Sequence, residues 1–215
     1  LDRQPRHIEC FNNSNLQGAH PVASCVVFRD GKPSRKEYRH FNIKTVTGAD
    51  DYASMREVVF RRYTRLMAEG AEMPDLIIAD GGKGQMGVIH EVLERLGLDI
   101  PIAGLAKDDR HRTAELLCGF PPVLVGIRPT SPLFHFLAHI QEEVHRFAVS
   151  FHRQKRSKAF IHSELEQIEG VGDKTVQTLL RHFRTVEKVR AANIEELSAL
   201  VGAAKAKKIR AFFEK

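Results

Sequence analysis

The stretch PDLIIADGGKGQ, residues 74–85, contains a short apolar strand that ends in a carboxylate and a pair of glycines. We expect this strand over Asp75–Asp80, a helix over about 84–96 and a second strand over Ile102–Lys107. A strand, a helix and a strand in succession are typical of a parallel segment of a sheet. The stretch therefore predicts an α/β fold in which Asp80 ends a central strand.

The residues upstream predict antiparallel strands followed by a helix. His7–Asn15 and Val22–Phe28 are extended and β-rich, residues 30–31 (Asp-Gly) are a two-residue turn signal, and Lys36–Lys44 alternates between apolar and charged side chains. Apolar residues then recur at helical spacing from about residue 50 until a glycine at 70. Two acidic residues at the start suit a helix N-terminus.

The residues downstream predict a hairpin and a long helix. Glu115–Cys118 and Val123–Val125 form the expected hairpin, and Pro132 opens a helix whose apolar stripe continues to Phe151. Such a stripe packs a helix against a sheet. Together these elements predict a mixed α/β sheet with helices on its faces.

The distribution of charge divides the chain. Residues 1–150 hold 19 Lys/Arg and 19 Asp/Glu, whereas residues 151–215 hold 14 and 8, which accounts for the net charge of +6. We predict one domain over 1–152, a basic linker over 153–160 and a small all-α domain over 161–215. A short basic segment indicates a polyanionic partner.

Composition excludes several classes of protein. With 42% hydrophobic and 28% charged residues the chain is typical of globular proteins. No apolar run approaches the roughly 18 residues of a membrane span, and no signal peptide is present, so we expect a cytoplasmic protein without membrane contact. Three separated cysteines indicate structural thiols. Because the chain begins with Leu1, we expect it to be part of a longer protein.

The basic tail carries a pattern for binding phosphates. In QIEGVGDKTVQTLL (167–180), two glycines flank a valine directly before a helix, as in the helix-hairpin-helix motif. The helix N-terminus then offers free N–H groups to an anion. A weaker copy lies in LVGAAKAKKI (200–209). Two such hairpins would bind both DNA strands without reading bases, in a salt-dependent way. The alternative is an ordinary glycine-capped turn. The candidate contacts are Gly170, Gly172, Lys174, Gly202, Lys205 and Lys207.

Three polar residues in the larger domain are candidates for catalysis. Asn12 lies within an extended apolar run, Asp80 ends the apolar strand, and His145 lies beside the stripe of the long helix. Oxygen ligands at a strand end suit the hard cations Mg²⁺ and Mn²⁺. For Asp80 alone, a helix N-cap is the alternative.

Five ordered segments resemble the endonuclease domain of the UvrC family, and the tail resembles that family's tandem helix-hairpin-helix domain. The segments are IECFNNSNLQG (8–18), VASCVVFRDGKP (22–33), GADDYASM (48–55), PDLIIADGGKGQ (74–85) and EEVHRFAVSFHR (142–153). The resemblance covers nearly the whole chain. It implies the C-terminal half of the family's protein, with an RNase H-like fold before the helical tail.

This resemblance also implies a function. The family's domain cuts a damaged DNA strand on the five-prime side of the lesion during nucleotide excision repair. It acts on damaged duplex DNA with unpaired junctions, after UvrA has loaded UvrB, which the protein contacts mainly through segments that this chain lacks. Its metal site is Asp–Asp–His, and the last two ligands match Asp80 and His145. Asp51 matches a further acidic position implicated in activity.

The chain departs from the family at its first metal ligand. The family pattern is ECFD, whereas this chain has Asn12, whose carboxamide lacks the charge that holds Mg²⁺. A catalytically silent DNA-binding module is therefore the main alternative to an active endonuclease. A ribonuclease or junction resolvase of the same fold is a third. His145 suits either a ligand or a proton-transfer group.

Several basic residues are candidates for phosphate contacts, with a solvated surface charge as the alternative for each. Lys83 follows the glycine pair and Arg146 follows the candidate histidine. The linker contributes Arg153, Lys155 and Arg156. His135 and His139 lie four residues apart on the long helix, and we interpret them as packed or surface side chains.

Overall fold

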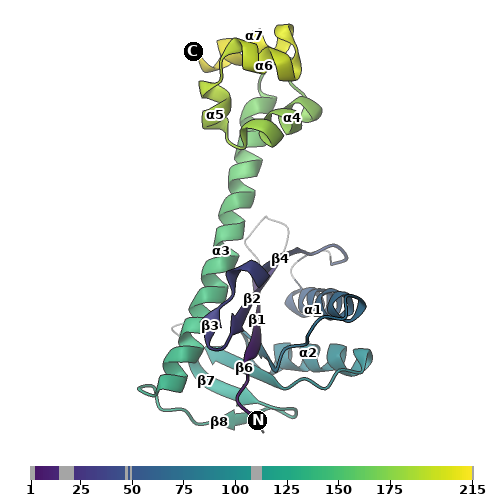
Figure 1. Cartoon of the computed structure of the whole chain (residues 1–215), viewed down its shortest axis with the longest axis vertical. Coiled ribbons are helices and arrows are strands. Elements are labelled where there is room, and N and C mark those ends of the chain that lie inside the picture. Colours follow the sequence, from purple (N-terminus) through teal and green to yellow (C-terminus); the bar gives the residue numbers. More distant parts are fainter. Residues whose placement is uncertain (1–2, 15–21, 47, 49, 108–112, 215) are drawn as a thin grey trace. The chain divides into compact units, whose positions relative to one another are not determined.

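The computed structural model describes residues 3–14, 22–46, 48, 50–107 and 113–214 (Figure 1). The chain divides into two compact units, Leu1–Phe151 and His152–Lys215.

The first unit is built on an eight-stranded mixed sheet. The strand order is β3-β2-β1-β5-β6-β7-β8, and β4 also pairs with β2. β1 is parallel to β5 and β5 to β6, and the remaining pairs are antiparallel. The strands are β1 (His7–Ser14), β2 (Val22–Arg29), β3 (Lys32–Pro33), β4 (Arg39–Asn42), β5 (Leu76–Ala79), β6 (Ile102–Lys107), β7 (Thr113–Cys118) and β8 (Val123–Val125).

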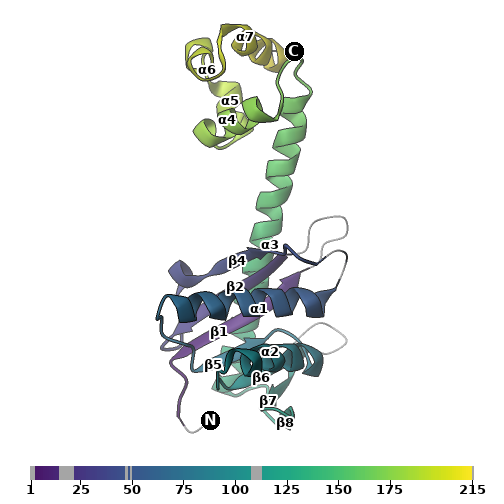
Figure 2. The ribbon, with the colours of Figure 1, turned by 90° about the vertical axis from the view of Figure 1, so that its right-hand side faces the viewer.

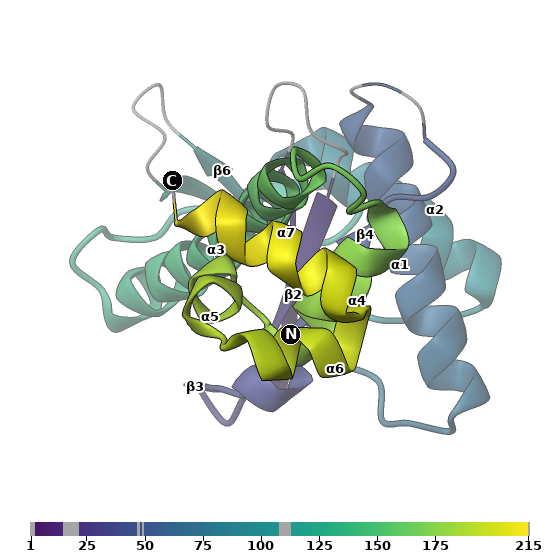
Figure 3. The ribbon, with the colours of Figure 1, turned by 90° about the horizontal axis from the view of Figure 1, so that it is seen from above.

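Helices cover both faces of this sheet. α1 (Asp51–Ala68) and α2 (Lys83–Leu96) lie on one face, and the first turns of α3 (Pro132–Glu166) lie on the other (Figures 2 and 3). Ile140, Val144 and Ala148, which belong to the expected apolar stripe of α3, are buried. This arrangement confirms the predicted mixed α/β sheet with flanking helices.

Local signals explain most of the element boundaries. Asp50 caps α1, because its side chain accepts a hydrogen bond from the backbone N–H of Ala53 at 2.9 Å. Asp30 and Gly31 both adopt positive φ, 49° and 76°, as the predicted two-residue turn requires. The hairpin of β7 and β8 is also present where the sequence predicts it.

The structure differs from the prediction in two segments. The strand expected over Lys36–Lys44 is limited to β4, because a 3-10 helix, η1 (Arg35–Glu37), precedes it. The backbone of the predicted linker 153–160 is helical and lies within α3, so the end of the long helix predicted near Phe151 is wrong. Long basic side chains favour helices, and this segment contains no glycine or proline to end one.

The second unit consists of helices with a core of their own. After the end of α3 come α4 (Asp173–Phe183), α5 (Val186–Ala191), α6 (Ile194–Val201) and α7 (Ala203–Phe213). Among the side chains that the structure describes in this unit, the fully buried ones are Leu165, Val176, Leu179, Val189, Leu197, Ala206 and Ile209. The predicted all-helical tail is confirmed. Among the helices in the described ranges, none has the length and apolar character needed to cross a bilayer.

Candidate active site and nucleic-acid interface

Asn12 and Asp80 lie beside one another at the carboxyl ends of two parallel strands. Phe11 of β1 is opposite Ala79 of β5, and the backbone N–H of Asp80 donates to the carbonyl of Phe11 at 2.9 Å. Both polar side chains are buried, with exposed fractions of 8% for Asn12 and 5% for Asp80. The carboxyl ends of parallel strands are the usual location of functional sites in α/β sheets.

Both side chains face α3. Successive residues of a strand point to opposite faces, and Phe11 packs edge-on against Tyr63 of α1, with ring centroids 6.1 Å apart. Asn12 therefore points to the α3 face. Asp80 points the same way, because Nε2 of Gln141 on α3 donates to its Oδ1 at 2.5 Å.

Gln141 is a site residue that the sequence interpretation missed. It is 6% exposed and lies four residues after Leu137 and three before Val144, both in the buried stripe of α3. An amide at a stripe position was the available signal, since buried polar groups need a partner. The partner is Asp80, so Gln141 orients the candidate carboxylate.

His145 lies one turn after Gln141 on α3, and its side chain is exposed. Within the described part of the chain it forms no hydrogen bond or ion pair with Asn12 or Asp80. Over the same residues, no three His, Cys, Asp or Glu side chains form a group that could hold a metal ion. The structure thus brings together two of the three predicted ligands, whereas His145 is exposed on α3.

Asp51 lies on the opposite side of the sheet from these residues. It is the first residue of α1, and its backbone carbonyl accepts a hydrogen bond from Nδ2 of Asn13 at 2.6 Å. Asn13 follows Asn12 and therefore points to the α1 face. Asp51 and Lys83 line an open hollow of about 740 Å³ between the N-termini of α1 and α2.

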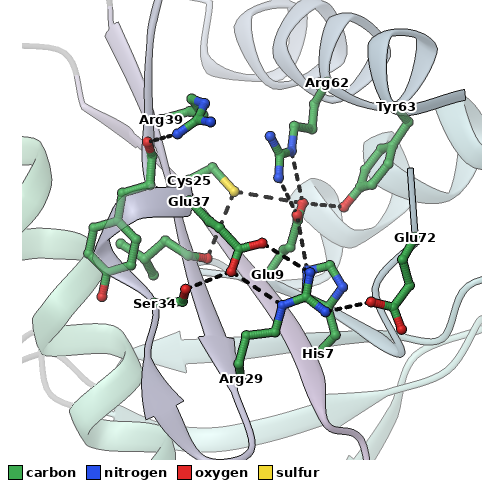
Figure 4. A network of polar contacts seen from close by, with 12 residues as sticks. His7, Glu9, Cys25, Arg29, Ser34, Glu37, Arg39, Arg62, Tyr63 and Glu72 are labelled. Atoms are coloured by element: carbon green, nitrogen blue, oxygen red, sulfur yellow. Dashed lines mark hydrogen bonds and ion pairs between the residues drawn. The ribbon is translucent and has the colours of Figure 1, made fainter. Parts of the chain in front are cut away.

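A buried polar network lies on the α1 face of β1 (Figure 4). Glu9 has an exposed fraction of 0% and accepts hydrogen bonds from Nη2 of Arg62 at 2.5 Å and from the hydroxyl of Tyr63 at 3.0 Å. Nε2 of His7 lies 3.4 Å from Glu9 Oε1, at ion-pair distance. Burial alone would raise the pKa of Glu9, but contacts with His7 and Arg62 outweigh it and lower the pKa. The sequence interpretation did not single out this network.

The candidate phosphate-binding side chains of the first unit differ in their surroundings. Lys83 is exposed at the start of α2. Arg146 is 56% exposed, but its guanidinium forms an ion pair with Glu143, with N–O distances of 2.7 Å and 2.8 Å. Glu143 also accepts a hydrogen bond from the hydroxyl of Tyr38 at 3.0 Å. The side chains of Arg153, Lys155 and Arg156 lie outside the described residues.

The two predicted hairpins are present in the second unit. Gly170, with φ of +83°, leads to Gly172, which precedes α4. Gly202, with φ of +84°, connects α6 directly to α7. This positive φ is accessible to glycine without steric cost. Neither α4 nor α7 has a side-chain N-cap, so both N-termini keep backbone N–H groups for an anion.

The starts of α4 and α7 lie side by side. Nζ of Lys205 donates to Oγ1 of Thr175 at 2.9 Å, and each of these is the third residue of its helix. Lys205 is therefore engaged within the protein, whereas Lys174 and Lys207 are exposed. The predicted basic residues thus separate into an internal lysine and two that can reach a ligand.

Comparison with known proteins matches each of the two units to a described domain family. Residues 1–149 match the model of the UvrC RNase H endonuclease domain, and residues 163–215 match that of the SAM-like helix-hairpin-helix tandem. A protein of Bacteroides fragilis named UvrABC system protein C is 60% identical over 98% of the chain. Its namesake in Bacteroides thetaiotaomicron is 56% identical over 98%. The chain spans about a third of the length of these curated relatives, 34% and 35%.

Among solved structures, endonuclease V of Ciona intestinalis in complex with a 23mer DNA is similar over 51% of this chain and 52% of that one. The TM-score is 0.37 and the sequence identity 13%. This likeness is too low to support an inference.

Proposed function

Because the chain belongs to the UvrC family, we propose that its first unit is a metal-dependent DNA endonuclease domain and that its second unit holds the DNA backbone. The reaction is hydrolysis of a phosphodiester on the five-prime side of a lesion, in nucleotide excision repair. The partners are damaged duplex DNA with unpaired junctions and UvrB. The observation that carries the proposal is the buried pair Asn12 and Asp80 at adjacent parallel strand ends.

The side chains at these strand ends fit a hard divalent cation, Mg²⁺ or Mn²⁺. Asp80 offers a carboxylate and Asn12 a carboxamide oxygen, and Mg²⁺ in proteins is often held by one or two carboxylates together with substrate phosphates. A bound ion would polarise the scissile phosphate and lower the pKa of the attacking water. Asp80 would hold the ion, with Gln141 fixing the orientation of its carboxylate.

Asn12 decides whether this chain is active. A carboxamide has no charge to balance the ion, so we expect weak metal binding and little incision, and a silent DNA-binding module remains the second candidate. His145, exposed one turn beyond Gln141, would complete the coordination or move a proton near neutral pH. Asp51 would act from the other face by holding the start of α1 beside β1.

The Asn12→Asp variant tests the catalytic proposal. A labelled duplex with a bubble junction is incubated with the chain or the variant in Mn²⁺, with and without UvrB. We expect the variant alone to nick the strand, and Asp80→Asn in the same background to abolish nicking. Equal incision by both versions would show that residue 12 is not a ligand. An RNA–DNA hybrid in place of the bubble separates a ribonuclease from a repair nuclease.

The exposed lysines test the DNA-binding proposal. We expect Lys174→Ala or Lys207→Ala to weaken DNA binding several-fold and to reduce the slope of log affinity against log salt by about one. Lys205→Ala is the matched control on α7, because its ammonium is bonded to Thr175. Fluorescence anisotropy at four salt concentrations measures this. A larger reduction of the salt slope for Lys205→Ala than for Lys207→Ala would contradict the proposed surface.

A further inference from the structure

Four polar side chains form a row across the α3 face of the sheet, one from each of four neighbouring strands. Asp80 follows β5 and Asn12 is its neighbour on β1. Asn12 pairs with Ser24 of β2, and Ser24 pairs with His40 of β4. Directly paired residues of antiparallel strands project to the same face. We call Asp80, Asn12, Ser24 and His40 the polar row.

Contacts on both faces support this orientation. Cys25, the residue after Ser24, contacts Glu9 on the α1 face, with Sγ 3.8 Å from Oε2. Ser24 therefore points to the opposite face. The ring of His40 stacks on Phe147 of α3, with ring centroids 3.7 Å apart. The polar row thus lies between the sheet and α3, in line with the candidate metal site.

Ser24 is the member of the polar row with an unpaired buried atom. Its exposed fraction is 0%, and its Oγ has no hydrogen-bond partner among the residues that the structure describes. By contrast, Asp80 is bonded to Gln141, and Nε2 of His40 lies 3.0 Å from the carbonyl of Phe147. A buried hydroxyl without a partner is unfavourable and requires an explanation.

The position of Ser24 explains it. Side chains of a directly paired antiparallel couple have Cβ atoms about 4.5–5.5 Å apart, so rotation of the hydroxyl about χ1 can bring it to the side-chain oxygen of residue 12. We propose that Ser24 is a positioning residue of the candidate metal site. Its hydroxyl donates to the residue-12 side chain and so directs the oxygen lone pairs of that side chain towards the divalent cation.

This inference rests on the proposed function, because it requires residue 12 to contact the cation. A carboxylate at position 12 has two oxygens, so one can accept the Ser24 hydroxyl while the other faces the ion. The carboxamide of Asn12 has one oxygen, which must do both. Removing the hydrogen-bond partner of a metal ligand commonly lowers the metal affinity by about 10- to 100-fold.

Binding of Mn²⁺ alone, without DNA, tests the inference in the chain and in its Asn12→Asp variant. Free Mn²⁺ is measured by electron paramagnetic resonance. We expect Ser24→Ala to weaken Mn²⁺ binding about tenfold in the Asn12→Asp background, at the lower end of that range. Ser54→Ala is the matched control: Ser54 is 2% exposed, its Oγ is also unpaired among the described residues, and it lies on α1 outside the polar row. Its effect should stay within about twofold, well below the loss expected for a partner of a metal ligand.

A second variant separates positioning from packing. Ser24→Thr keeps the hydroxyl and should recover most of the affinity, with thermal unfolding confirming that each variant is folded. Unchanged affinity in Ser24→Ala, or equal weakening in Ser54→Ala, overturns the inference while the proposed metal site stands. A folded Ser24→Thr that binds as weakly as Ser24→Ala also overturns it. Absence of Mn²⁺ binding in both backgrounds overturns the inference and the metal site together.

Discussion

Glu9 is a buried carboxylate on β1, and two neighbouring residues of α1 donate hydrogen bonds to it. Arg62 supplies a charge and Tyr63 a hydroxyl. A buried charge is costly unless it is paired and hydrogen-bonded. Burial, together with the nearby carboxylate of Glu9, raises the pKa of Tyr63 well above its usual value, so the phenol stays protonated and donates. The network therefore fixes α1 against β1, which carries Asn12.

Arg62→Met would leave Glu9 charged, buried and without its cationic partner on α1. We expect it to lower the free energy of unfolding by about 3–5 kcal/mol, measured by urea denaturation. Arg56→Met is the matched control on the same helix: its ion pair with Glu91 has side chains 42% and 58% exposed. Its loss should be below about 1 kcal/mol. Similar losses in the two variants would contradict the importance of burial.

Glu57 is a second carboxylate with a strongly shifted pKa. Burial opposes its ionisation, but hydrogen bonds from Thr45, from the backbone of Lys44 and from Arg61 lower its pKa from 4.5 to about 2. The backbone N–H of Thr45 lies 2.8 Å from Glu57 Oε2. The carboxylate thereby anchors the segment after β4 to α1.

This shift predicts a pH dependence of stability. Because the pKa of Glu57 is lower in the folded state, its contribution is complete above about pH 4.5 and is lost as the pH falls towards about 2. We expect Glu57→Gln to be less stable than the parent by about 1–3 kcal/mol at pH 7 and nearly equal at pH 2. Glu69→Gln, at an exposed pair with Arg65 at the C-terminal end of the same helix, should differ by less than about 0.5 kcal/mol throughout. A pH-independent difference for Glu57→Gln would contradict the assignment.

At the scale of elements, the loop that carries Asp80 is packed tightly against β6. A Cβ added at Gly104 would lie 2.5 Å from Sδ of Met86 and 2.9 Å from the carbonyl oxygen of Gly81. Met86 is a fully buried residue of α2, and Gly81 follows Asp80. The absence of a side chain at 104 therefore allows β6, α2 and the Asp80 loop to meet.

We expect Gly104→Ala to lower the free energy of unfolding by about 1–3 kcal/mol, since the backbone of the Asp80 loop must move. Gly87→Ala on α2 is the matched control, because its nearest neighbour, Cε2 of Phe120, is 3.9 Å away. An alanine in an open helical position should stabilise the protein by about 0.5–1 kcal/mol. Thermal and urea unfolding measure both. Destabilisation by Gly87→Ala as large as that by Gly104→Ala would contradict the close approach.

Periodicity in the sequence predicted the elements of the first unit well, with one exception before β4, and charge misled the interpretation of one segment of α3. Alternation over Lys36–Lys44 predicted a long strand, but its first residues form η1 instead. The side chain of Glu37 in this turn accepts hydrogen bonds from Ser34 at 2.6 Å and from Arg29 at 3.0 Å. The basic run at 153–160 was interpreted as a linker from its charge. Charge says little about backbone conformation, and the run is helical.

At the scale of the whole molecule, each unit has its own hydrophobic core. Ile78 is fully buried in the core of the first unit, and Leu179 is fully buried in that of the second. Each core consists of side chains from its own unit. The one element whose residues fall in both units, among those that the structure describes, is α3. Separate cores predict separate unfolding.

Calorimetry should therefore resolve two transitions. We expect Ile78→Ala to lower the midpoint of one transition and Leu179→Ala that of the other, each destabilising its unit by about 2–5 kcal/mol. The double variant should show both shifts additively, because the two residues belong to different hydrophobic cores. A single transition that both variants lower would show that α3 couples the units into one cooperative fold.

The sequence by itself determined the fold class, the helical tail with its two glycine hairpins, and the placement of Asp80 at the end of a strand. These features depend on local periodicity and on short motifs, which neighbouring residues carry. Only the tertiary structure decided which side chains meet. Gln141 reaches Asp80 across 61 positions and Arg62 reaches Glu9 across 53. Ser24 lies opposite Asn12 because of strand register. Register and helix docking depend on the packing of distant residues, which no local pattern encodes.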